Sequence, residues 1–296
     1  MLTHHEGTGT GGMGNTRKLE TMMLQDLLLT VLIGGMALLY ASVGHAGSSG
    51  YQAAMGLMGL PPEVMKPTAL FLNLVVATLG TLQFARAGLI RWRQLGWLVC
   101  TSIPMAFMGG RFSLPGGWYY LIVAVVLWLA AWQLWRHANQ EQPATQEQSP
   151  SQQADTGEAA ASGMTPVGTH GQEKAWPLVL LGAVLGLLSG LTGTGGGIFL
   201  TPALILGGWA APREAAGTSV AFILVNSPAA LLGWWQKQPS LEMLPTLLPW
   251  WMVLVAGCGW LGAWYGSRRG SPRMLRRLLA LVLVIAGLKM VLNASH

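Results

Sequence analysis

Charged side chains are scarce in this sequence: Asp, Glu, Lys and Arg make up 9% of its 296 residues, whereas soluble domains carry roughly 25%. So few charges could not cover the surface of a water-exposed protein of this size, which excludes a soluble globular fold. Cysteine is nearly absent, and Cys100 and Cys258 lie in apolar runs without metal-binding or redox spacing, which excludes a disulfide scaffold. With 52% hydrophobic residues, the composition predicts a membrane protein.

The acidic residues are concentrated in one polar stretch, 137–175. This stretch contains five of the eleven acidic residues and a single base, Lys174, and is rich in Gln, Ser, Ala, Pro and Thr without any aromatic residue. Such a composition cannot bury enough apolar surface to offset the entropy of ordering, so it predicts a solvated linker. The rest of the chain has a net charge of +10, but its bases lie between apolar runs, so no nucleic-acid partner is expected.

The remaining sequence consists of long, continuous apolar runs. Because a bilayer core takes about 20 residues of helix and these runs do not alternate, they predict transmembrane helices. We therefore expect an all-α polytopic membrane protein with a disordered polar tail over 1–23, a first transmembrane repeat over 24–136, the linker over 137–175 and a second repeat over 176–296. Full spans are expected near 24–44, 67–85, 94–112, 116–136, 176–193, 217–235, 244–265 and 274–293.

Two further apolar segments, 47–60 and 195–209, are too short to cross comfortably and are rich in glycine. Whether these segments cross the membrane decides the orientation of the two halves, because short loops rich in Lys and Arg favour the cytoplasmic side. One arginine cluster lies within 86–93 and another within 268–277. Both clusters reach the same side only if each short segment completes a crossing, which predicts two inverted repeats with the termini outside.

Tryptophan is frequent, with 14 residues, and most lie near the ends of the expected spans. This position is typical of the aromatic belt at a membrane–water interface and requires no ligand role. The belt is expected to contain Trp92, Trp97, Trp118, Trp135, Trp176, Trp234, Trp235, Trp250, Trp251 and Trp264.

The two halves repeat one order of motifs: a glycine-containing segment, an apolar stretch, a Pro-x-Glu turn and a Thr-containing start of the next span. Gly44 and Thr68 are 24 residues apart, and Gly193 and Thr218 are 25 apart, so the register is nearly kept. Such duplicated order indicates an internal repeat. The segments read Gly44-His45-Ala46-Gly47-Ser48-Ser49-Gly50 and Gly193-Thr194-Gly195-Gly196-Gly197.

Glycine runs of this kind predict broken helices inside the membrane, since glycine costs about 1 kcal/mol relative to alanine within a helix. The helical piece that follows a break begins with free N–H groups and a partial positive charge, which favour an anion. In transporters built from inverted repeats, short Gly-interrupted segments at matching positions indicate the substrate site. The alternative is that the glycines only permit close helix packing.

Polar side chains gather around both breaks and in the spans that follow. Any one of them could instead form an ordinary interhelical hydrogen bond. The candidate substrate-binding residues are Gly44, His45, Gly47, Ser48, Ser49, Gln52, Thr68 and Asn73 in the first half, and Gly193, Thr194, Gly195, Gly196, Gly197, Thr201, Thr218, Ser219 and Asn226 in the second.

His45 is the only histidine within an expected membrane segment. It could relay a proton or donate a hydrogen bond to an anion, or equally bond a neighbouring helix. Gly47-Ser48-Ser49-Gly50 also fits the G-x-S-G pattern of intramembrane serine proteases, but that chemistry needs a base from a second helix, and no other histidine lies in the membrane. We therefore do not expect an enzyme, and no cofactor or metal site is indicated.

The second-half motif, followed by Pro202 and Gly217-Thr218-Ser219, resembles the repeat of the TauE/SafE sulfite exporter family. The resemblance covers 24–293 apart from the linker, and the first half departs from it at His45 and Ala46. It implies a multi-pass protein of the bacterial inner membrane that transports a small anion, such as sulfite, a sulfonate or a related organosulfur compound, with coupling to protons.

The residues themselves suggest how such transport would work: two half-helix N-termini hold the anion while the halves rock to give alternating access. An anion channel that uses the same glycine breaks as a filter is the alternative, and a structural membrane subunit is a third. The expected partners are the anion and the lipid bilayer, and the sequence is compatible with a homo-oligomer.

Overall fold

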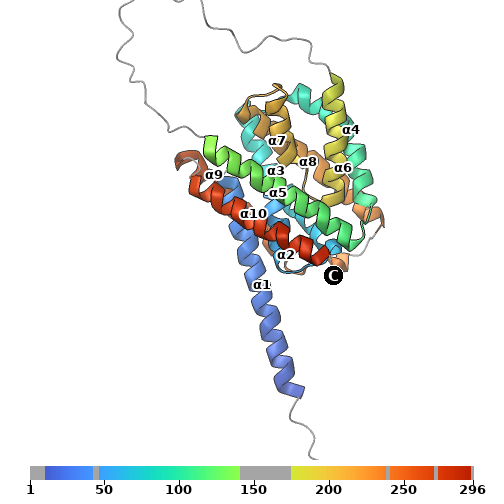
Figure 1. Ribbon diagram of the computed structural model, residues 1–296, viewed down its shortest axis with the longest axis vertical. Coiled ribbons are helices and arrows are strands. Elements are labelled where there is room, and N and C mark those ends of the chain that lie inside the picture. The colour runs from blue at the N-terminus through green and yellow to red at the C-terminus, as the bar shows by residue number, and fades with distance from the viewer. Residues whose placement is uncertain (1–10, 43–46, 141–174, 238–240, 270–272, 295–296) are drawn as a thin grey trace, which may run out of the picture.

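A computed structural model of the chain describes residues 11–42, 47–140, 175–237, 241–269 and 273–294. All regular structure in these ranges is helical, which confirms the predicted all-α class (Figure 1). The first half contains α1 (Gly11–Ser42), α2 (Ser48–Leu57), α3 (Pro62–Arg86), α4 (Trp92–Arg111) and α5 (Gly116–Gln140). The second contains α6 (Ala175–Thr192), α7 (Gly197–Leu206), α8 (Pro212–Lys237), the short 3-10 helix η1 (Leu241–Met243), α9 (Leu248–Arg269) and α10 (Arg273–Ala294).

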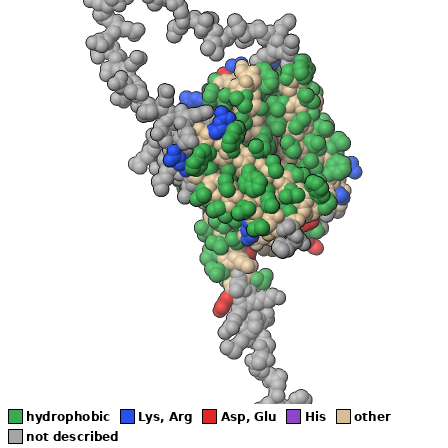
Figure 2. Space-filling view, in the orientation of Figure 1, with side chains coloured by type: hydrophobic (Ala, Val, Ile, Leu, Met, Phe, Trp, Pro, Cys, Tyr) green, Lys and Arg blue, Asp and Glu red, His purple; other side chains and the backbone are tan. Residues whose placement is uncertain are grey.

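Helices occupy all eight ranges that were expected to span the membrane, and the two short segments form α2 and α7. Within the described residues, five helical stretches are long and apolar enough to cross a membrane by length and composition alone: Met22–Ala41, Pro62–Arg86, Gly116–Arg136, Ala175–Thr192 and Pro212–Lys237. Hydrophobic side chains cover most of the face in Figure 2, and charged ones are few. This surface suits contact with lipid.

Helix α1 differs from the expected boundary, because it begins at Gly11 and crosses residues 11–23, which the sequence assigns to a polar tail. From Asn15 to Asp26 the chain has no glycine or proline to end a helix, so the helix of the apolar run can propagate backwards. The first half of α1 stands clear of the other helices in Figure 1, and burial begins at Leu29. Residues 1–10 lie outside the described ranges.

The linker lies almost wholly outside the described residues as well. Helix α5 continues to Gln140 and α6 begins at Ala175, so only the ends of the expected 137–175 linker are described, and they are helical. The linker's solvated character stays a prediction.

Helices of the two halves pack in reciprocal pairs. Helix α4 lies along α6 and α8, and α9, which occupies the position of α4 in the second half, lies along α1 and α3. The remaining large contacts join equivalent helices, α3 with α8 and α5 with α10 (Figure 1). Each half therefore packs chiefly against the other half.

Helices α4 and α6 run parallel and in close contact. The backbone of α6 at Gly182, Gly186 and Gly190 meets α4 at Leu98, Ser102 and Ala106 in turn. A methyl group on Gly186 would lie 2.4 Å from the carbonyl oxygen of Ser102, so glycine permits this approach, as small residues do between membrane helices. Helix α7 then returns towards the start of α4, where Gln94 donates a hydrogen bond to the Trp209 carbonyl.

Helices α1 and α9 are related in the same way. Gly34 faces Leu254, and a methyl group on Gly262 would lie 2.3 Å from the Leu38 carbonyl oxygen, so the two helices are also parallel. The α4–α6 pair ends beside the segment that joins α6 to α7, since Gly109 of α4 lies against Gly190 and Leu191 of α6. The inverted orientation of the repeats in a membrane stays a prediction.

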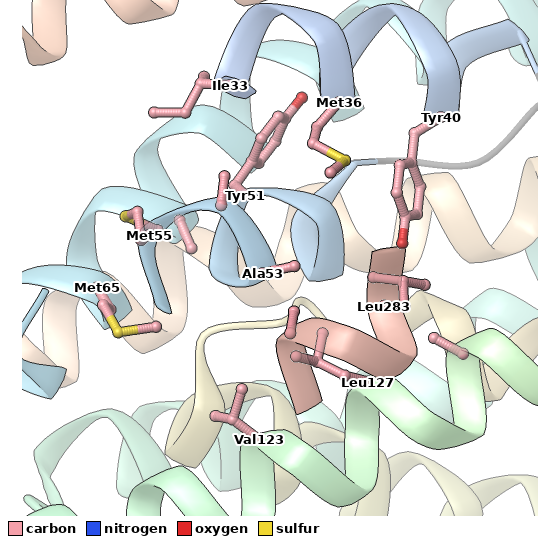
Figure 3. Packing of buried hydrophobic residues seen from close by; sticks show 14 of the residues in the cluster. Ile33, Met36, Tyr40, Tyr51, Ala53, Met55, Met65, Val123, Leu127 and Leu283 are labelled. Carbon is pink, nitrogen blue, oxygen red and sulfur yellow. The ribbon is translucent and has the colours of Figure 1, made fainter. Parts of the chain in front are cut away.

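The largest core surrounds α2. Tyr51 points from α2 towards Ile33 and Met36 of α1, while Val123 and Leu127 of α5 close the other side (Figure 3). All of these side chains are buried. Leu283 of α10 belongs to the same core, so the core fixes α2 between helices of both halves.

Eight of the ten tryptophans assigned to the interfacial belt are exposed, but Trp234 and Trp251 are buried. The indole N–H of Trp251 donates a 2.8 Å hydrogen bond to the Thr30 hydroxyl of α1. The interpretation as belt residues is wrong for these two, because their position near a helix end coincides with a contact between helices rather than with the surface.

Candidate functional site

The segment between α6 and α7 reverses the chain within a few residues. Helix α6 ends at Thr192 and α7 begins at Gly197. Between them Gly193, Gly195 and Gly196 have φ angles of +79°, +76° and +73°. This left-handed region is accessible to glycine at no steric cost and is rarely adopted by other residues, which accounts for the glycines of the second-half motif.

The same segment lies against the first half of the chain. A methyl group on Gly193 would lie 2.8 Å from the Lys66 carbonyl oxygen and 3.3 Å from the Gln52 amide nitrogen. A methyl group on Gly195 would lie 3.2 Å from the Asn73 amide nitrogen. Glycine is therefore required here for close approach as well as for backbone conformation.

Three helices of the first half donate hydrogen bonds to this segment. The Gln52 amide of α2 and the Tyr119 hydroxyl of α5 both donate to the Thr192 carbonyl, the latter at 3.1 Å. The Asn73 amide of α3 donates to the Gly193 carbonyl at 3.4 Å. Gln52, Asn73 and Gly193, which are distant in sequence, thus belong to one cluster.

This cluster has buried polar atoms without partners. The Oε1 of Gln52, the Oδ1 of Asn73 and the hydroxyl of Ser189 have no hydrogen-bond partner, and all three residues are fully buried. Among the described residues, the N–H groups of Gly195, Gly196 and Gly197 also lack an acceptor. Because most buried polar groups in proteins are paired, a cluster of unpartnered polar atoms favours a polar ligand.

Two threonines, Thr192 and Thr194, form hydrogen bonds within the segment itself. The hydroxyls of Thr192 and Thr194 are 2.8 Å apart, and the Thr194 N–H donates to the Thr192 hydroxyl at 3.3 Å. Thr192 also donates to the Leu188 carbonyl at 2.7 Å. These bonds fix the backbone that presents the free glycine N–H groups.

In the first half, Gly44 and His45 lie outside the described residues. Helix α2 begins at Ser48, and a methyl group on the preceding Gly47 would lie 2.7 Å from the Tyr51 hydroxyl. The hydroxyls of Ser49 and Tyr40 are 2.7 Å apart. This start of α2 is buried among aromatic side chains and is joined to the α6–α7 break through Gln52.

The other predicted residues make contacts between helices. Thr201 of α7 donates a 2.9 Å hydrogen bond to Ser219 of α8. Thr218 accepts a 3.1 Å bond from the Arg91 N–H, at the loop before α4. The Asn226 amide donates to the Phe222 carbonyl of its own helix at 2.9 Å, and its Oδ1 has no partner.

Four residues near the break were not among the predicted ligands: Tyr40, Lys66, Tyr119 and Ser189. Lys66 is 6% exposed, although the expected span started one residue later, at 67. A charged side chain so close to a span is a signal that could have identified it, because charges within membrane segments are rare and functional. Tyr119 carries no comparable signal, since only the fold brings it to the break. Ser189 precedes Gly193, and Tyr40 precedes Gly44, by four residues, so their nearness to the glycine segments in sequence could have identified them.

The sequence as a whole matches a family of known proteins. The family described as "Sulfite exporter TauE/SafE" matches residues 27–290. A relative from Sinorhizobium fredii (strain NBRC 101917 / NGR234), named "Probable membrane transporter protein y4hK", is 37% identical over 255 residues, which cover 86% of this chain and 94% of the relative. No solved structure matches the chain. The match spans both halves, and the chain belongs to the TauE/SafE family of membrane transporters.

Proposed function

We propose that this protein is a multi-pass secondary transporter of the bacterial inner membrane that moves a small sulfur oxyanion, such as sulfite or a sulfonate, at the α6–α7 break. One observation carries the proposal: polar groups from both halves converge on this break and leave buried atoms without partners. The family and the named relative are transporters, so the role is transport rather than enzymatic turnover.

The chemistry of the break suits an anion. Free N–H groups at the start of α7 carry the partial positive charge of a helix N-terminus, and the Ser189 hydroxyl can donate another hydrogen bond. The amide of Asn73 lies beside Gly195 and can rotate to offer its N–H₂ group to a ligand. None of the described residues that donate to the break is a carboxylate.

The helix pairs support alternating access as the mechanism. The site lies where α2, α3 and α5 of the first half meet the α6–α7 break of the second. A rocking motion of one half against the other would open this junction towards one side and then the other. The reciprocal pairs, α4 with α6 and α9 with α1, fit two repeats that are related by a two-fold axis.

Counterflow of radiolabelled sulfite in proteoliposomes tests the site. Asn73→Ala removes a charge-assisted hydrogen bond, a contribution of about 1.5–3 kcal/mol, so we expect at least a tenfold loss of sulfite affinity. Gln133→Ala is the matched control, because Gln133 of α5 is also a buried amide with an unpartnered atom but lies more than ten residues beyond Tyr119, the residue of α5 that contacts the break. The proposal fails if both variants transport like the wild type.

The gradient experiment separates a transporter from a channel. With an imposed proton gradient, a coupled transporter accumulates sulfite above its equilibrium distribution, whereas a channel only dissipates the gradient. Accumulation that persists without the proton gradient would remove proton coupling from the proposal. In His45→Gln, an unchanged pH dependence of sulfite flux would remove the proposed proton role of that residue.

A further inference from the structure

Lys66 is a buried lysine in the first turns of α3. Its Nζ donates hydrogen bonds to three backbone carbonyl oxygens at the end of α4: 2.9 Å to Gly109, 3.0 Å to Gly110 and 3.1 Å to Phe112. No other side chain is involved in this arrangement. The lysine therefore closes the C-terminal end of α4 from a different helix.

The number of acceptors defines the charge of the side chain. An ammonium group has three N–H donors, whereas a neutral amine has two, so three carbonyl partners favour the charged form. The carbonyls at a helix C-terminus carry a partial negative charge that stabilises a cation. In the part of the chain that the structure describes, Arg91 forms an ion pair with Glu214, whereas Lys66 forms none with a carboxylate.

This charge lies beside the α6–α7 break. The Cα of Lys66 would be 3.2 Å from a methyl group on Gly193, and an extended lysine places its Nζ roughly 6 Å from its Cα. The carbonyl-bearing Gly109 in turn packs on the backbone of α6 at Gly190 and Leu191. Together, the approach of the Lys66 Cα to Gly193 and the length of the lysine side chain place the ammonium within about 10 Å of the break.

We propose that Lys66 is the fixed positive charge that determines charge selectivity at the break and makes a divalent oxyanion preferred over a monovalent one. This inference rests on the proposed function. All three donors of the ammonium are used by carbonyls, so Lys66 does not contact the anion and acts through its electric field. It is a specificity residue that works at a distance.

The expected size of the effect follows from Coulomb's law. At about 10 Å and an effective dielectric constant of about 20, one unit charge changes the affinity for a monovalent anion roughly tenfold and for a divalent anion roughly a hundredfold. The ratio of the two affinities therefore changes roughly tenfold when the charge is removed. A role confined to closing α4 would instead lower both affinities by the same factor.

Competition against counterflow of radiolabelled sulfite measures this ratio in the full-length protein, with unlabelled sulfite at pH 8 and methanesulfonate as competitors. Lys66→Gln keeps hydrogen-bond donors but removes the charge, and we expect the sulfite-to-methanesulfonate affinity ratio to fall roughly tenfold. Lys66→Arg keeps the charge and should keep the ratio. Arg93→Gln is the matched control, because Arg93 is exposed in the first turn of α4, at the other end of that helix from the carbonyls that Lys66 binds, and its field is screened.

An unchanged ratio in an active Lys66→Gln protein would overturn the inference and leave the proposed function intact. Absence of sulfite counterflow in the wild type would overturn both. If Lys66→Gln does not yield a folded protein, the wild type is tested with the uncharged analogue dimethyl sulfone. If dimethyl sulfone competes as strongly as methanesulfonate, the inference is overturned. Competition that weakens from sulfite to methanesulfonate and again to dimethyl sulfone supports it.

Discussion

Gly193→Ala tests how tightly the break is held against the first half. Gly193 has φ of +79°, so any side chain there is strained. A methyl group would also lie 2.8 Å from the Lys66 carbonyl oxygen and 3.2 Å from its Cα, both of which belong to the backbone of α3. The substitution must therefore displace the break from α3 and weaken the Asn73 hydrogen bond.

Two effects contribute to the expected loss of stability, and a control separates them. A left-handed alanine costs about 1–2 kcal/mol, and overpacking against backbone adds about 1–3 kcal/mol. Gly59 has φ of +73° with no atom within 4 Å of a methyl group, so Gly59→Ala carries the first cost alone. Gly257 is a helical glycine in open space, and Gly257→Ala should be neutral or stabilising, by up to about 1 kcal/mol.

Thermal unfolding of the detergent-purified variants, followed by size-exclusion chromatography, gives the order of stability, and sulfite counterflow gives activity. We expect Gly257→Ala to be the most stable, then Gly59→Ala, then Gly193→Ala, with transport impaired only in the last. Equal Tm values for Gly59→Ala and Gly193→Ala, together with normal transport in both, would refute the argument that the break depends on its contact with α3.

Three other outcomes are expected from single contacts. Glu214→Gln breaks the 2.9 Å ion pair with Arg91, and because both groups are partly exposed we expect at most about 1 kcal/mol, with recovery in the charge-swapped double variant; a Tm unchanged in the single variant but lowered in the double one would contradict this. Trp251→Ala should cost about 3–5 kcal/mol, whereas Trp251→Phe should lose mainly the Thr30 hydrogen bond, about 1 kcal/mol; similar Tm values for the two would argue against a packing role. Gly110→Ala would place a methyl group 2.2 Å from the Ala230 carbonyl oxygen, so we expect the folded yield in chromatography to fall sharply.

The helices could be predicted because the local sequence determines where each one forms. Continuous apolar runs define the spans, and glycine runs define where they stop, as at Gly193–Gly197. The extension of α1 to Gly11 was missed because hydropathy marks where a helix enters a membrane rather than where it begins. The α1 residues 22–28 are exposed, so no buried face continues the apolar pattern towards the start of the helix.

The site could be predicted only in part, because its members depend on which helices meet. The glycine motif led to Gln52 and Asn73 through the internal repeat, and both donate to the α6–α7 break. Thr218 fits the same motif but bonds the Arg91 N–H instead. The role of Tyr119 depends on contacts between α5 and the break, which lie 73 residues apart in the chain.

The two halves share their packing but differ in their chemistry. Thr68 and Thr218 are equivalent in the repeat, so the position of Lys66 corresponds to that of Ala216. At this position only the first half has a charged residue. That charge is held by the carbonyls at the end of α4, within about 10 Å of the break of the second half, where three glycines leave N–H groups free. A duplicated scaffold can thus bring a cation from one half next to free donors from the other, and an anion at their junction would depend on both halves. In a chain with so few charges, one buried lysine is enough to set the sign of the site.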